Sequence, residues 1–144
     1  CANLSLGELT REVIAPQRLL AEGRGVHLAE ELPESLPAVC TQAEHLIQAL
    51  SVVLEHAVRE TPPGGEVRVA VREDGGTITF GITDSAAPIL AHSVPLSEVA
   101  SGPTRVELRY CQSVAEALGG SARYEPTENG NRYVLSLPVR GRGK

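Results

Sequence analysis

The chain has 144 residues, a formal net charge of −5 at pH 7 and a hydrophobic fraction of 42%. This length predicts one domain with a substantial core, and the hydrophobic fraction excludes a disordered chain. The acidic balance argues against nucleic-acid binding, and no apolar run has the length of a membrane span. The three cysteines, Cys1, Cys40 and Cys111, are odd in number and lack metal-ligand spacing, which predicts free thiols in a reducing compartment.

The N-terminal part of the chain predicts a helix followed by a strand. Ser5 can cap this helix, and Gly23 and Gly25 are expected to end it. Pro16 lies in its middle and predicts a kink or a division, because proline cannot donate to the helix ladder. Residues 26–33 then alternate between apolar and polar side chains, which is typical of a strand with one buried face.

The longest helix is predicted at residues 44–60, where apolar residues recur at helical spacing. Its core-facing residues are Leu46, Leu50, Val53 and Ala57. Thr61 and Pro62 end this helix, since proline also biases the residue before it away from helical geometry. Two runs with period two, residues 67–72 and 77–83, predict two strands joined by a hairpin turn.

The rest of the chain predicts a segment with an aspartate, an irregular loop, a third helix and a closing hairpin. Residues 84–89, D-S-A-A-P-I, follow the second strand, and residues 90–104 show no regular period. Residues 105–118 predict a helix with an apolar face. That face is formed by Leu108, Cys111, Ala115 and Leu118. The last predicted element is a hairpin at residues 121–138, with its turn rich in Asn and Gly.

The order of these elements and the residues within them resemble the ATP-binding domain of two-component sensor histidine kinases, in the GHKL group of ATPases. Where the family helix carries N-L-L-x-N-A-x-K-[YF]-T-P-x-G-G, residues 52–65 read V-V-L-E-H-A-V-R-E-T-P-P-G-G. The resemblance covers essentially the whole chain and implies an α/β fold, a two-layer α/β sandwich of the Bergerat type. It implies a mixed sheet of about five strands covered by about three helices, as a single domain over residues 1–144.

In the resembled family, three positions of the long helix face the nucleotide, and here they are Val52, His56 and Arg59. The family asparagine at the position of His56 helps to bind magnesium through its side-chain oxygen. An imidazole nitrogen is a poor ligand for magnesium, and Val52 offers no ligand at all. Arg59 can still pair with a phosphate. The alternative is that His56 has no role at a nucleotide and is an ordinary solvated or hydrogen-bonded histidine.

The resemblance places five further residues at the nucleotide. Asp84 stands where the family aspartate accepts a hydrogen bond from the adenine amino group, although an aspartate here can also cap a turn through its own backbone. Ala86 and Pro88 stand where glycines let the backbone approach the nucleotide. Arg105 and Glu107 stand where glycines open the third helix toward the phosphates, and their alternative is a solvated helix face.

These departures from the family pattern define the leading functional hypothesis. The chain keeps the residues that specify the fold and loses those that hold magnesium and ATP. The domain is therefore expected to be a pseudokinase module that acts through protein contact and is inactive in isolation. The sequence offers no catalytic arrangement and no metal-ligand spacing. ATP with magnesium is expected as a cofactor only if the altered pocket still binds them.

Two alternatives remain open at this point. The domain could bind ATP or ADP atypically, with Asp84 at the adenine and Arg59 at the phosphate, and donate phosphate to a histidine in helices preceding Cys1. It could also be a sensor that binds another small molecule in the vacated pocket. The expected partners are the dimerisation helices of the parent chain and a response regulator or another kinase, with no nucleic acid. The resemblance implies that the isolated domain is monomeric and cytoplasmic. It leaves open whether the parent protein is anchored in a membrane.

Overall fold

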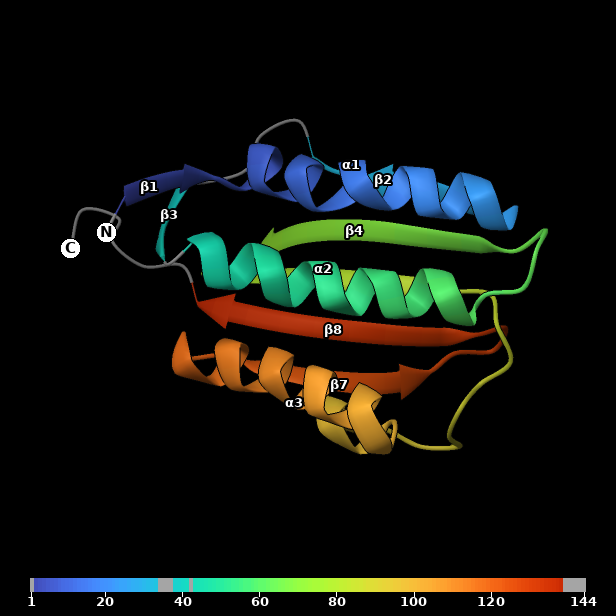
Figure 1. The fold of residues 1–144 in the computed structure, drawn as a ribbon. Coiled ribbons are helices and arrows are strands. Elements are labelled where there is room, and N and C mark those ends of the chain that lie inside the picture. Colours follow the sequence, from blue (N-terminus) through green and yellow to red (C-terminus); the bar gives the residue numbers. More distant parts are fainter. Residues whose placement is uncertain (1, 34–37, 42, 139–144) are drawn as a thin grey trace.

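The computed structural model describes residues 2–33, 38–41 and 43–138. Within them, three α-helices lie on one face of a six-stranded sheet (Figure 1). The helices are α1 (Leu6–Arg24), α2 (Ala43–Glu60) and α3 (Gly102–Ala117), with α2 between the other two. None of the described helices is long and apolar enough to cross a membrane. The predicted two-layer α/β sandwich is confirmed.

The main sheet is mixed and has the strand order β2-β4-β5-β8-β7-β6. Its strands are β2 (His27–Glu31), β4 (Glu66–Asp74), β5 (Thr77–Asp84), β6 (Val94–Pro95), β7 (Ser121–Pro126) and β8 (Asn131–Pro138). Strands β2 and β4 are parallel, and every other neighbouring pair in this sheet is antiparallel. A separate antiparallel pair joins β1 (Ala2–Ser5) to β3 (Ala38–Thr41).

The sixth strand of the sheet lies in the segment for which the sequence predicts an irregular loop. Val94 and Pro95 pair with Tyr124 and Arg123 of β7, and a short 3-10 helix, η1 (Leu96–Glu98), follows directly. Val94, Leu96 and Val99 are all buried. Burial of these apolar side chains fixes the segment, although two paired residues are too few to show a period in the sequence.

Helix α1 continues through Pro16, so of the kink or division expected from the sequence, the division does not occur. Val13 and Ile14 before the proline and Ala21 after it are buried, and the helix packs against α2. This packing outweighs the loss of one backbone hydrogen bond. The helix continues through Gly23 and ends at Gly25, whose φ of 73° lets its N–H bond the carbonyl oxygens of Ala21 and Glu22.

The core lies between the three helices and the sheet, with α2 in its centre. The buried residues of α2 are Leu46, Ala49, Leu50, Val53, Leu54, Ala57 and Val58. At the end of α2, the hydroxyl of Thr61 donates to the Ala57 carbonyl oxygen at 2.7 Å, and Arg24 donates to the carbonyl oxygens of Val58 and Arg59. These bonds satisfy carbonyl groups that a helix end leaves open and fix the turn that carries His56.

Candidate functional site

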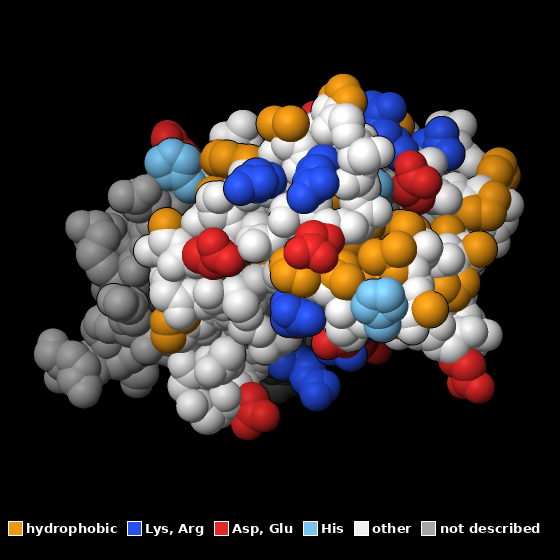
Figure 2. All heavy atoms as spheres, turned by 90° about the horizontal axis from the view of Figure 1, so that it is seen from below, with side chains coloured by type: hydrophobic (Ala, Val, Ile, Leu, Met, Phe, Trp, Pro, Cys, Tyr) orange, Lys and Arg blue, Asp and Glu red, His pale blue; other side chains and the backbone are white. Residues whose placement is uncertain are grey.

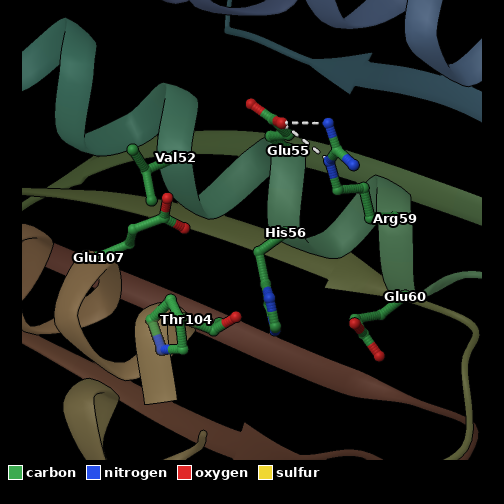
Figure 3. Close-up of a pocket in the computed structure, with 8 residues that line it drawn as sticks. Val52, Glu55, His56, Arg59, Glu60, Thr104 and Glu107 are labelled. Atoms are coloured by element: carbon green, nitrogen blue, oxygen red, sulfur yellow. Dashed lines mark hydrogen bonds and ion pairs between the residues drawn. The ribbon is translucent and has the colours of Figure 1, made fainter. Parts of the chain in front are cut away.

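A pocket of about 350 Å³ opens between the C-terminal half of α2 and the first turns of α3 (Figure 3). It is lined by Val52, Glu55, His56, Arg59, Glu60, Pro103, Thr104 and Glu107. Four of the eight site residues predicted from the sequence, Val52, His56, Arg59 and Glu107, therefore meet here. The three on α2 share a face because they are spaced by four and then three residues.

The other four predicted site residues do not line this pocket. Asp84 and Ala86 are buried at the end of β5, with 6% and 8% of their surface exposed, and Pro88 is exposed in the segment that follows. Arg105 is exposed on α3. Helix α3 begins at Gly102, three residues before the expected start. Arg105 and Glu107 therefore lie within the helix instead of at its first residue.

The pocket lining has three glutamates and one arginine. Glu55 accepts a hydrogen bond from Arg59 Nε at 2.8 Å and forms an ion pair with Arg59 Nη2 at 2.7 Å. The one arginine of the lining is therefore already paired. Glu60 and Glu107 are exposed, and within the described part of the chain neither makes a hydrogen bond or ion pair. Glu55 and Glu60 line the pocket but were not among the site residues predicted from the sequence. Their helical spacing from Val52 and His56 places them on the same face.

The imidazole of His56 points away from α2 into the pocket, between Thr104 and Glu60 (Figure 3). Its Nε2 atom is shielded from solvent and has no hydrogen-bond partner, and its ring meets the ring of Tyr133 edge-on at 5.6 Å. Burial lowers the pKa of His56, against the opposing charges of Glu60, Asp84 and Glu107. The ring is therefore neutral at pH 7. In the described residues no group of three or more His, Cys, Asp or Glu side chains fits a metal ion.

Asp84 uses its two carboxylate oxygens differently. Oδ1 accepts from the Ala86 N–H at 3.0 Å and from Asn131 Nδ2 at 2.9 Å, so the turn-capping role is present. Oδ2 is buried without a partner. Burial raises the pKa of Asp84, against the lowering effect of the hydrogen bonds from Asn131 and Ala86. A carboxylate oxygen that is buried and unpaired is costly, which marks this group for a role other than stability.

Tyr133 is the third member of a buried polar cluster with His56 and Asp84. Its side chain is 0% exposed, and its hydroxyl lies close to the Asp84 carboxylate without a well-formed hydrogen bond. Burial together with this carboxylate raises the pKa of Tyr133 above the ordinary range. Among the described residues, the unpaired buried polar atoms are His56 Nε2, Asp84 Oδ2 and the Tyr133 hydroxyl. The period of β8 predicts an inward side chain at Tyr133, and an inward phenol needs a partner, so a signal for this residue existed.

Asn131 ties the segment after Asp84 to the sheet. This side chain is fully buried, and its Nδ2 donates to Asp84 Oδ1 and to the Ala87 carbonyl oxygen at 3.1 Å. Its Oδ1 accepts from the Ile89 N–H at 2.9 Å and from the hydroxyl of Tyr124. The Leu90 N–H donates to the same hydroxyl at 3.2 Å. These bonds tie the segment after β5 to β7 and β8.

Asn131→Ala is expected to lower the free energy of unfolding by about 2–4 kcal/mol, because it leaves several buried polar groups unpaired. Amide exchange at Ile89 should accelerate more than exchange in the middle of β8, since the segment loses its tie. Hydrogen exchange and urea unfolding measure both effects. Asn129→Ala, at an exposed position of the same turn, is the control and should change stability by less than about 0.5 kcal/mol. Equal effects of the two substitutions would contradict the assignment.

The fold is an α/β sandwich with a pocket between two of its helices, and comparison with known proteins identifies its family. A family model for histidine kinase-, DNA gyrase B- and HSP90-like ATPases matches residues 41–141. The nucleotide-free catalytic domain of histidine kinase ThkA superposes with a TM-score of 0.83 at 20% identity, covering 98% of both chains. ThkA in complex with the response regulator TrrA gives a TM-score of 0.82 at 19% identity, covering 96% of this chain and 42% of that one.

Two sensor proteins show similarity in sequence. Adaptive-response sensory kinase SasA of Prochlorococcus marinus (strain MIT 9313) is 26% identical over 150 residues, which cover 95% of this chain and 40% of SasA. Sensor protein DivL of Caulobacter vibrioides is 31% identical over 133 residues, which cover 86% of this chain and 17% of DivL. The chain belongs to the family of histidine kinase-, DNA gyrase B- and HSP90-like ATPases. It spans less than half the length of these relatives.

Proposed function

We propose that this domain has lost normal magnesium–ATP binding and works as a pseudokinase module through contact with other proteins. The observation that carries the proposal is the chemistry of the pocket between α2 and α3. Members of this family generally bind ATP with magnesium. Here Val52 supplies no ligand, and His56 supplies a neutral imidazole where magnesium requires oxygen ligands.

The charges of the lining also oppose a triphosphate. Arg59 is paired with Glu55, and Glu60 and Glu107 carry uncompensated negative charge. Two like charges a few ångströms apart repel by about 1–4 kcal/mol at the dielectric of water or of a protein surface. Without a cation to bridge them, the phosphates of ATP would meet this repulsion at the place where relatives stabilise them.

A role in protein contact is supported by exposed apolar side chains. Ile89 and Val106 are large apolar side chains with 39% and 69% of their surface exposed, in the segment after β5 and in α3. Figure 2 shows apolar side chains between acidic and basic ones on one face of the molecule. Such mixed patches are typical of interfaces. ThkA is seen with its response regulator, so we propose a response regulator, another kinase or the parent's dimerisation helices as partners.

The observation that favours a second function is the unpaired Oδ2 of Asp84. An aspartate oxygen left free in this position could accept a hydrogen bond from the amino group of an adenine, as the family aspartate does. The domain would then bind ATP or ADP atypically.

The double substitution Val52→Asn/His56→Asn tests the proposal. If the loss of oxygen ligands explains the loss of binding, the variant should bind ATP in magnesium-containing buffer at least about tenfold more tightly than the wild type. Fluorescent-nucleotide displacement measures both proteins. A wild type that already binds magnesium–ATP with micromolar affinity would contradict the proposal. The control is the same titration without magnesium, in which the two proteins should not differ.

A further inference from the structure

The outward face of α3 carries a stripe of apolar and small side chains that stays largely exposed in the described structure. Val106, Tyr110, Ser113 and Ala117 recur at i, i+4, i+7 and i+11, so they lie along one side of the helix. Helix α3 is the outermost helix of its layer, because α2 lies on only one side of it (Figure 1). Val106, Ser113 and Ala117 are exposed. The spacing of the stripe is the one at which two helices pack together.

The two ends of this stripe are complementary in shape. At the N-terminal end, Val106 presents an apolar side chain with 69% of its surface exposed. At the C-terminal end, a mainly apolar groove of about 250 Å³ lies between α2 and α3. It is lined by His45, Tyr110, Ser113, Val114, Ala117 and Leu118. A second α3 that ran antiparallel to the first would bring its Val106 to this groove, and a two-fold axis would repeat the contact at the other end.

The charges beside the stripe are complementary in the same orientation. Arg105 and Arg109 are exposed one helical turn apart, and their side chains have no hydrogen-bond or ion-pair partner among the described residues. Glu116 lies seven residues after Arg109 on the same flank of α3 and accepts a hydrogen bond from Gln112 at 3.1 Å, but no cationic side chain of the described chain pairs with it. In an antiparallel pair, Glu116 of each copy would lie opposite Arg105 and Arg109 of the other.

From this complementarity we propose that two copies of the domain dock through antiparallel α3 helices, with each Val106 in the groove of the other copy. A second copy fits because the protruding side chain, the groove and both signs of charge occur on one helix, as an isologous contact requires. The inference deepens the proposed function, since it names one partner for the protein contact. A single helix pair buries less than the roughly 1,200 Å² of a standard interface, so a dissociation constant of roughly 0.1 mM is expected.

Sedimentation equilibrium at low ionic strength, from about 10 µM to about 1 mM protein, tests the contact. The wild type should show a reversible equilibrium between monomer and dimer. Arg105→Glu/Arg109→Glu should weaken the dimer about fivefold or more, because like charges then face each other, and Glu116→Arg should do the same. The triple variant that combines these substitutions should restore the wild-type dissociation constant, since opposite charges face each other again.

Val106→Ser should also weaken the dimer about fivefold or more, because it removes the apolar side chain that fills the groove. Leu19→Ser is the matched control. Leu19 is 75% exposed on α1, and its replacement should leave the dissociation constant unchanged. A wild type that stays monomeric at millimolar concentration would overturn the inference. So would a triple variant that fails to restore association, or equal weakening by Val106→Ser and Leu19→Ser.

ATP titrated into the Val106→Ser variant separates this inference from the proposed function. Magnesium-dependent ATP binding by that variant would overturn the proposed function and leave the dimer contact in place. A wild type that neither binds ATP nor associates would overturn the dimer contact alone.

Discussion

Gly130→Ala should lower the free energy of unfolding by about 3 kcal/mol or more, the largest loss expected from a single methyl group near the site. A Cβ atom at Gly130 would lie 1.8 Å from the carbonyl oxygen of Asp84 and 2.8 Å from its carbonyl carbon. Both atoms belong to the backbone, which cannot rotate away. The start of β8 would have to separate from the end of β5, where Asp84 pairs with Asn131.

Gly23→Ala is the control for this substitution. Gly23 lies inside α1, and a Cβ atom there would meet no heavy atom within 4 Å. Alanine is the better helix former, so this variant should gain about 0.5–1 kcal/mol. Urea unfolding of the three proteins measures the difference. A loss below about 1 kcal/mol in Gly130→Ala would show that the strands open at little cost, and the packing described around Asp84 would be wrong.

Asp84→Asn should raise stability at neutral pH by about 1 kcal/mol, because it removes a buried charge whose Oδ2 has no partner. The amide oxygen can keep the bonds from Ala86 and Asn131, and the amide nitrogen can donate toward Tyr133. Asp84→Ala should instead destabilise the domain, since it leaves the Ala86 N–H and Asn131 Nδ2 without their acceptor. A residue whose conservative replacement stabilises the fold is one that is kept for function.

The pH dependence of the same variant follows from the direction of the pKa shift. Burial raises the pKa of Asp84 above its ordinary value of 3.8, so the folded state holds this proton more tightly than the unfolded state. The contribution of the group to stability is full below the unfolded pKa and is lost as the pH rises through the folded pKa. The advantage of Asp84→Asn should therefore be largest at neutral pH and shrink on acidification.

Urea unfolding between neutral and acidic pH tests this dependence, with Asp74→Asn as the control. Asp74 is exposed in the hairpin between β4 and β5, and its replacement should change stability by less than about 0.5 kcal/mol at neutral pH. If Asp84→Asn lost stability at neutral pH, the carboxylate would be a structural group, and its unpaired oxygen would carry no functional meaning.

The elements with a strong local period could be predicted from the sequence. Helix α2, the β4–β5 hairpin and the closing β7–β8 hairpin all occur where the apolar periods and turn residues place them. Gly75 and Gly76, with φ of 60° and 87°, form the two-residue turn that a tight hairpin requires. The start of α3 could not be placed, because Gly102 and Pro103 are typical of a break as well as of a first helical turn.

The site could be predicted only in part. Helical spacing brings Val52, His56 and Arg59 to one face, and the structure confirms that arrangement. The contacts of Asp84 with Asn131, and of His56 with Tyr133, depend on the register of β5 against β8 and on the packing of α2 over that pair. No local pattern encodes these contacts. The ion pair of Glu55 with Arg59, by contrast, has the i, i+4 spacing at which charged side chains meet on a helix, so the sequence could have predicted it.

Titration of the folded wild-type domain with ATP by calorimetry, with and without magnesium, tests the central claim most directly. The chemistry of Val52, His56 and the uncompensated glutamates predicts no heat of binding at ATP concentrations up to roughly millimolar, under either condition. Micromolar binding that requires magnesium would contradict the claim. If Asp84→Asn also abolished that binding, the adenine site would be intact and the domain would be a working nucleotide-binding kinase module.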